Sequence, residues 1–234
     1  MTSERESRRL NLENAWDLGG LPTGVGSTRS GQLFRSMKPD ALDMNGWAAM
    51  IASGVTTIVD LRNDDEVLTE TLRPVALVVH RRPVEDQGDD DFMAEWGNRL
   101  GSPVVLPGGA EALARAHRGR HRRNCRCPEP GAVPLRGRTR PHRDDSAMIE
   151  ELVGVDRTAI LDDHADVVRA FHGWKRSDEF REAPQTDDQL DANLATALAE
   201  LGTFLDAIDI EQYLLDAGLS DEQLSRIRPR LLDD

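Results

Sequence analysis

The sequence predicts an α/β domain with a mostly parallel sheet flanked by helices. The run from Val55 to Val59 is almost entirely β-branched, which suits a strand buried on both faces. Apolar residues recur at helical spacing between 39 and 53, and Gly54 stands where a capping glycine would end that helix. A length of 234 residues allows one large domain or two small ones, with a sizeable core.

The other elements follow from the same patterns. Residues 21–29 are punctuated by glycine and proline and predict a loop or hairpin, and a second strand is expected over 75–80. Ser220 followed by Gln223 has the pattern of a capping box at the start of a last helix. Further helices are predicted over 65–71, 92–100, 147–155, from 156 or 158 to 171, 191–208 and 211–217.

The overall charge and the absence of certain segments narrow the function classes. A net charge of −13 argues against affinity of the whole protein for nucleic acid or for an anionic membrane. No apolar run reaches the ~18 residues of a membrane span, and no signal peptide is visible. The two cysteines do not make a disulfide framework, so the expected location is the cytoplasm, with secretion by another route left open.

The first candidate site is at the end of the predicted strand. Asp60 and Arg62 follow its apolar run directly, and ligands of open α/β sheets bind at the carboxyl ends of the strands. The structural alternative is that Asp60 caps a turn and that Arg62 is solvated at the rim of the sheet.

A basic window interrupts this otherwise acidic chain. Between Glu111 and Arg143 there are ten arginines, no lysine and two acidic residues, whereas the remainder holds 19 basic and 40 acidic residues. Both cysteines and three of the six histidines fall in the same window. Helix and strand periodicities are lost between about 107 and 147, so the window needs an explanation of its own.

Several short segments together resemble the bacterial tyrosine/dual-specificity phosphatase family, in the family's order and over about half of the chain. These segments are Trp16–Gly20, Thr28–Gly31, Leu33–Ser36, Gly54–Arg62, Leu152–Val155 and Tyr213–Arg228. The resemblance implies a single three-layer α/β domain that hydrolyses phosphomonoesters. Its parts would be a sheet half (1–106), an out-of-family basic segment (107–145) that disrupts the fold, and C-terminal helices (146–234).

The family carries its chemistry on a loop of the form His-Cys-x5-Arg-Thr-Gly between the last core strand and a helix. The loop N–H groups and the helix N-terminus depress the pKa of the thiol, and the arginine grips the phosphate oxygens with two donors. This sequence lacks the loop: six residues after Cys125 comes Gly131, and six after Cys127 comes Val133. The resemblance therefore assigns no catalytic residue here. It implies a substrate-binding rim of Asp17, Arg35, Asp60 and Arg62, whose structural alternative is buried ion pairs.

The genetic code offers an explanation for the missing loop. When the last two bases of each codon from Val133 to Asp145 are joined to the first base of the next, the degenerate codons admit, among other series, Phe-His-Cys-Ala-Gly-Gly-Arg-Asp-Arg-Thr-Gly-Met. The shifted reading of 115–127 admits an amphipathic helix. We hypothesise that roughly 107–145 is translated one base out of phase, with the phase restored near Ser146.

The hypothesis predicts a phosphatase family member that is inactive in its present sequence. Its substrates would be phosphorylated proteins or phosphoinositides, with phosphotyrosine, phosphoserine/threonine and phosphoinositide left open. No metal or cofactor is implied, and the oligomeric state is unknown. Phe171 to Phe180 would form part of a lid, and Trp16, Trp47 and Trp174 are expected to pack in the core or lid.

Three alternatives remain open at this point. The arginine-rich window could be an RNA-binding arm, although it contains no aromatic residue. A metal site is a second alternative, although Cys-x-Cys lacks the usual spacer; its ligands would be Cys125, Cys127, His117, His121 and His142. The third is a non-catalytic phosphatase-like module that binds phosphorylated partners or other proteins.

Overall fold

The computed structural model describes the backbone of residues 15–37, 42–62, 67, 74–81, 90, 94, 132–136, 142–175, 186–216 and 218–233, and the side chains of these except 37, 132–136, 142–145 and 171–175. The strands are β1 Ala15–Asp17, β2 Pro22–Thr23, β3 Gly26–Ser27, β4 Phe34–Met37, β5 Thr57–Asp60, β6 Val78–Arg81 and β7 Ala132–Arg136. The helices are α2 Met44–Ala52, α5 His142–Leu152, α6 Arg157–Lys175, α7 Asp187–Ala207, α8 Ile210–Asp216, α9 Asp221–Ser225 and α10 Ile227–Leu231.

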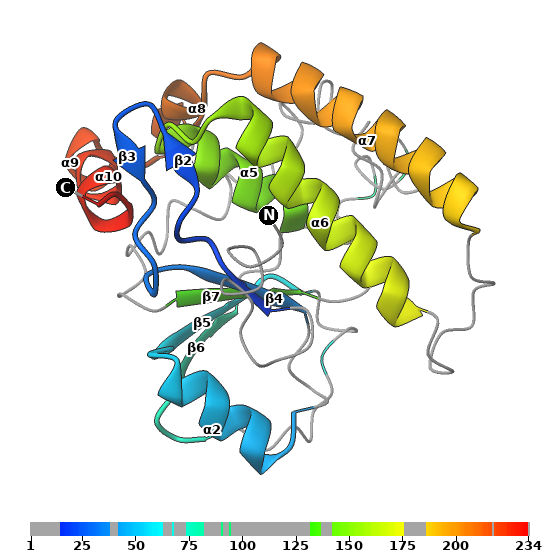
Figure 1. Ribbon diagram of the computed structural model, residues 1–234. Helices are drawn as coiled ribbons and strands as arrows, with labels where there is room; N and C mark the ends of the chain where they lie inside the picture. The colour runs from blue at the N-terminus through cyan, green and yellow to red at the C-terminus, as the bar shows by residue number, and fades with distance from the viewer. Residues whose placement is uncertain are drawn as a thin grey trace.

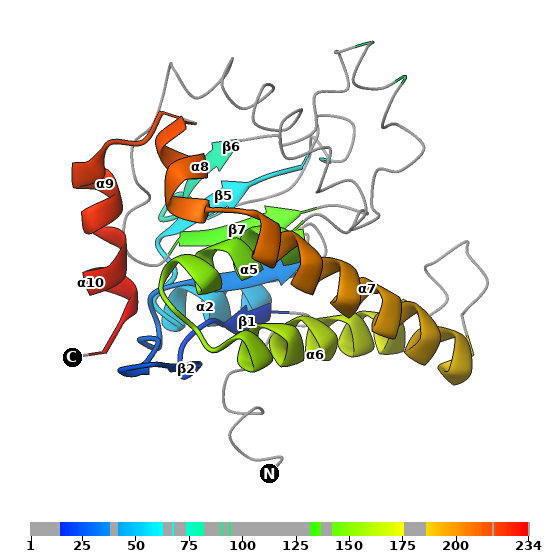
Figure 2. The ribbon, with the colours of Figure 1, turned by 90° about the horizontal axis from the view of Figure 1, so that it is seen from above.

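A five-stranded sheet in the order β1-β4-β7-β5-β6 forms the middle layer (Figure 1). β4, β7, β5 and β6 are mutually parallel, and only β1 runs antiparallel, to β4. α2 covers one face, and α5, α6 and α7 lie on the other, as Figure 2 shows from a second side. The predicted α/β fold with a mostly parallel sheet between helices is confirmed.

Each face of the sheet has its own apolar core. On the α2 side, Trp47 and Met50 pack against strand residues such as Phe34 and Ile58. On the other side the helices α5 to α8 form a separate cluster. The prediction that Trp16 and Trp47 lie in the core is confirmed, because they are only 8% and 2% exposed.

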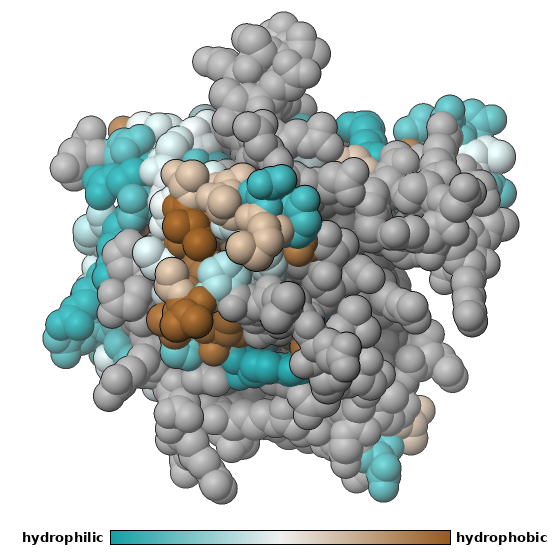
Figure 3. Space-filling view, turned by 90° about the horizontal axis from the view of Figure 1, so that it is seen from below, coloured by the Kyte–Doolittle hydropathy of each residue, from teal (hydrophilic) through white to brown (hydrophobic). Residues whose placement is uncertain are grey.

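The outer surface of the α2 side is partly apolar. Met44 and Ile51 on α2, and Val75 and Val78 beside and on β6, are exposed. Figure 3, which views the molecule from below, shows hydrophobic and hydrophilic patches next to one another among the described residues of that side. A mixed surface of this kind is ordinary for a globular protein.

Helix ends follow the local signals in the sequence closely. Gly54 has φ +87°, and the N–H groups of Gly54 and Val55 donate to Ile51 and Met50, which is the Schellman pattern. Because Val55 belongs to this helix end, β5 begins two residues later than the predicted strand. Gly154, with φ +83°, ends α5 in the same way, and Ser220 and Gln223 form the predicted capping box.

Two parts of the range 107–145, where the fold was predicted to be disrupted, form regular secondary structure. Residues 132–136 form β7, which lies between β4 and β5 in the middle of the sheet, and α5 begins at His142 rather than at 147. The rest of the window lies outside the described residues, as do most of the helices predicted over 65–71 and 92–100. The first half of the predicted lid, 171–175, is the end of α6, and the second half lies outside the described residues. Among the described residues, no helix combines the length and apolar character of a membrane span.

Candidate active site

The carboxyl ends of β4, β7 and β5 meet at one edge of the sheet. Leu135 of β7 stands opposite Ser36 on one neighbour and opposite Asp60 on the other. β7 ends at Arg136 and α5 begins at His142, so five residues connect the central strand to the helix. A strand, a short connection and a helix N-terminus in this order form the usual anion-binding arrangement of α/β folds.

Asp60 and Arg62 form a buried ion pair at this edge. Neither side chain is exposed to solvent. Arg62 donates from Nε to Oδ1 and from Nη2 to Oδ2 of Asp60, each at 2.9 Å, and its backbone N–H reaches Oδ1 at 3.2 Å. This two-pronged geometry is the strong form of a guanidinium–carboxylate contact and fixes the chain as it leaves β5.

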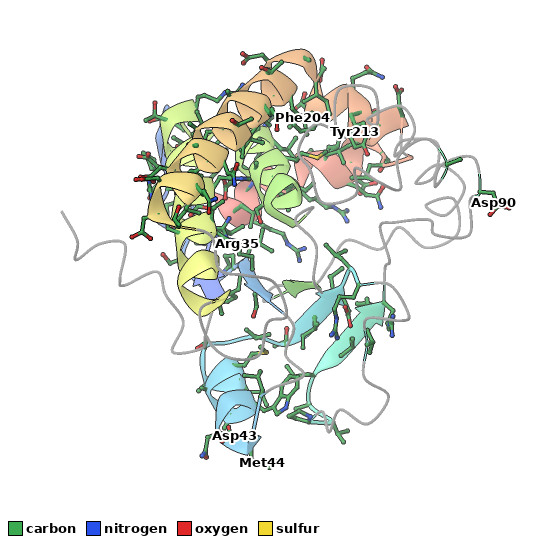
Figure 4. All side chains as sticks on the ribbon, turned by 90° about the vertical axis from the view of Figure 1, so that its right-hand side faces the viewer. Arg35, Asp43, Met44, Asp90, Phe204 and Tyr213 are labelled. Carbon is green, nitrogen blue, oxygen red and sulfur yellow. The ribbon has the colours of Figure 1, made fainter. Side chains whose placement is uncertain are left out.

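Arg35 is also buried, but it connects the sheet to α6 rather than to Asp60. Its Nη2 lies 2.5 Å from the Oδ2 atom of Asp163, and both side chains are less than a tenth exposed. The guanidinium carbon also lies 5.8 Å from the centre of the Trp16 ring, within range of a cation–π contact. Figure 4 shows Arg35 between the sheet and α6.

Asp17 holds two loops together. Its Oδ1 accepts the N–H of Gly19 at 2.9 Å and its Oδ2 that of Gly31 at 2.8 Å. Thr28 adds a second link, since its Oγ1 donates to the Leu18 carbonyl and accepts the Leu21 N–H. The two N-terminal segments singled out in the sequence are therefore one interlocked loop pair.

Position 19 of this loop pair has room only for glycine. A Cβ at position 19 would lie 2.2 Å from the Cα of Ser30, which no side chain can occupy. Its neighbour Gly20 has φ +74°, in the region that favours glycine.

The four predicted rim residues contact different partners. Asp60 pairs with Arg62, Arg35 pairs with Asp163, and Asp17 binds backbone N–H groups. Sequence reasoning missed Asp163, which lies 128 residues from its partner, and Arg81, whose Nη2 donates to the Arg62 carbonyl at 3.4 Å. No local pattern marks such distant contacts.

The ligands proposed for the metal alternative cannot be placed. Cys125, Cys127, His117 and His121 lie outside the described residues, and of His142 only the backbone is described. Elsewhere in the described part of the chain, no three His, Cys, Asp or Glu side chains come together as a metal site.

Residues 9–117 match the sequence pattern described as the tyrosine phosphatase family. Over this part, a little under half of its length, the chain is similar to the tyrosine phosphatase family. The family match includes the end of β5 with Asp60 and Arg62, and it stops at residue 117, before β7 and α5.

Two individual proteins are similar to this chain. The chain is 34% identical over 82 residues to the triple specificity protein phosphatase PtpB of Mycobacterium tuberculosis, and this match covers 34% of the chain and 30% of PtpB. A crystal structure of P. aeruginosa TpbA in complex with phosphotyrosine aligns with 82% of this chain and 88% of TpbA, at 14% identity and a TM-score of 0.38.

Proposed function

We propose that the chain has the scaffold of a phosphomonoesterase that works through a cysteinyl-phosphate, and that it is inactive in its present sequence. In this reaction a thiolate attacks phosphorus, an acid protonates the leaving oxygen, and water then releases phosphate from sulfur. The observation that carries the proposal is the connection from β7 to α5. The shifted reading puts the cysteine at the Leu135–Arg136 junction, at the carboxyl end of the central strand.

The spacing of the shifted motif fits that connection. The shifted arginine, six residues after the cysteine, falls at position 141, directly before α5 begins at His142. A cysteine at the strand end and an arginine at the helix start are what a phosphate cradle requires. In the present sequence those positions hold Leu135 and Pro141, which offer neither a nucleophile nor a guanidinium.

Pro134 supports an out-of-phase origin for β7. It stands opposite Val59, in a strand with a neighbour on each side. Proline has no N–H to donate to a ladder, and it is found almost only at sheet edges or bulges. The shifted reading replaces this residue by histidine, which has the missing donor.

The limits of the out-of-phase window agree with the family match and with the core. The match extends to residue 117, so we place the upstream limit between 107 and 117. Downstream, Ser146 and Ala147 of α5 are each only 2% exposed, and Ala147 belongs to the apolar cluster. In-phase residues thus resume where α5 enters the core. We propose a single domain, 1–234, that contains the out-of-phase window.

Asp17, Arg35, Asp60 and Arg62 remain predicted substrate-binding residues. Their contacts favour the structural alternative, in which they hold the strand ends and loops around the β7–α5 connection. The proposed substrate is a phosphorylated protein or a phosphoinositide. A cytoplasmic location also stays a prediction.

The test compares three purified proteins on an aryl phosphate: the present chain, a chain read in the shifted phase across the window, and a serine variant of the restored cysteine. We expect turnover by the restored chain only. Turnover by the present chain, or equal rates from the cysteine and serine forms, would refute the proposal. Binding of a phosphopeptide by the present chain without hydrolysis would favour the non-catalytic module instead.

A further inference from the structure

The C-terminal segment lies against the end of α5 that is farthest from the candidate site. The C-terminal clasp comprises residues 226–233, which contact both α5 and the hairpin formed by β2 and β3. Arg228 was singled out in the sequence as part of the last family-like segment, and the function proposed above does not use it.

Arg228 contacts the last turn of α5 directly. Its Nε donates to the Leu152 carbonyl at 3.0 Å, and its Nη2 lies 2.6 Å from the Glu211 carboxylate of α8. The last four carbonyls of a helix have no partner within the helix, and a cation at that end also interacts favourably with the helix dipole. Arg228 therefore ties α5 to α8 and to the C-terminal segment.

The other end of the clasp binds the hairpin. The Arg29 N–H donates to the Leu231 carbonyl at 2.7 Å, and the Asp233 N–H donates to the Ser27 carbonyl at 3.0 Å. The Asp233 carboxylate also accepts from Ser27 Oγ at 3.3 Å and from Arg29 Nε at 3.4 Å. These bonds join the last residues of the described chain to its first hairpin.

The hairpin in turn holds the chain that follows α5. Thr23 pairs with Val155 in an isolated bridge, and the Asp156 N–H donates to the Pro22 carbonyl at 2.9 Å. The contacts thus close a ring from α5 through Arg228, the C-terminal segment and the hairpin back to the end of α5.

We propose that this ring sets the position of α5, and that Arg228 is a positioning residue for the reaction at the β7–α5 connection. The inference rests on the proposed function. An 11-residue helix is a rod of roughly 16 Å, so a tilt at one end moves the other. Phosphate chemistry tolerates little movement, since a misplacement of about 1 Å can cost about 100-fold in rate.

The first arm of the test uses the present chain and does not depend on activity. In Arg228→Met, hydrogen exchange should become about fivefold faster at the amides of 153–155 and also at 146–149, as expected for the loss of one charge-assisted, half-exposed bond. Asp233→Ala should act in the same direction but less. The matched control is Arg226→Met, because Arg226 forms an exposed ion pair with Glu222 in the adjacent helix α9.

The second arm uses the chain restored to the shifted phase. Arg228→Met should lower kcat about tenfold on an aryl phosphate with little change in KM, and Arg228→Lys should recover part of the loss. Faster exchange confined to 153–155, or an unchanged kcat, would overturn the positioning role. If the restored parent is inactive, the proposed function fails, and the exchange at 146–149 still decides whether the clasp positions α5.

Discussion

Replacing Arg62 by methionine would remove the guanidinium that faces the buried Asp60 carboxylate. The side chains of this pair have no exposed surface, and two side-chain bonds of 2.9 Å join them. Methionine keeps much of the volume but removes both donors. Breaking a buried ion pair by removing one partner costs about 3–5 kcal/mol, so we expect R62M to lower the free energy of unfolding by that amount. For a domain with about 5–15 kcal/mol in total, the loss would be large.

A double-mutant cycle separates the pair from its surroundings. D60N leaves the guanidinium without its charge partner, and D60N/R62M removes the interaction from both sides. Each single change removes the same ion pair, so the sum of the two single losses counts that pair twice. The free energy of unfolding of the double variant should therefore fall by at least about 1 kcal/mol less than this sum. R226M serves as the control, since its exposed pair with Glu222 should contribute under about 1 kcal/mol.

Urea unfolding followed by tryptophan fluorescence measures each of these free energies, because Trp16 and Trp47 are buried and will report on loss of the core. The reasoning would be refuted if the losses of unfolding free energy in the two single variants added up to the loss in the double variant. A loss below about 1 kcal/mol in R62M would also refute it. Such a result would mean that the pair is solvated at the rim of the sheet.

Three further changes test the scaffold around the site, again by urea unfolding. Gly19→Ala should cost at least about 2 kcal/mol, because its Cβ would meet the Cα of Ser30, whereas Gly24→Ala has open space and should be nearly neutral; equal effects would contradict this. Arg35→Met should cost about 3–5 kcal/mol by removing the guanidinium that faces the buried carboxylate of Asp163 on α6, and a loss near zero would argue against that contact. Thr186→Ala removes the cap of α7 and should cost about 1 kcal/mol; an unchanged midpoint would mean that the capping box is unimportant.

Local signals predicted the parts of the fold that depend on neighbours in sequence. Gly54 and Ser220 mark helix ends because the capping bonds reach only a few residues along the chain. The helical spacing of residues 191–208 likewise predicted α7, to which the structure adds four residues at the N-terminus. The β5 strand was displaced only because Val55 completes the end of α2.

Long-range contacts could not be predicted in this way. The Arg35–Asp163 pair joins residues 128 apart, and nothing next to either residue indicates the other. Likewise, β7 is hidden at the sequence level, because Pro134 and the surrounding arginines are not a strand pattern. Its place between β4 and β5 is visible only in the structure.

The coding DNA for residues 107–145 tests the central claim most directly. The account predicts that the bases from Val133 to Asp145, read one position later, encode His-Cys-x5-Arg-Thr-Gly at the end of β7, with single-base changes on either side of the window. Codons whose shifted reading has no cysteine six residues before an arginine would contradict it.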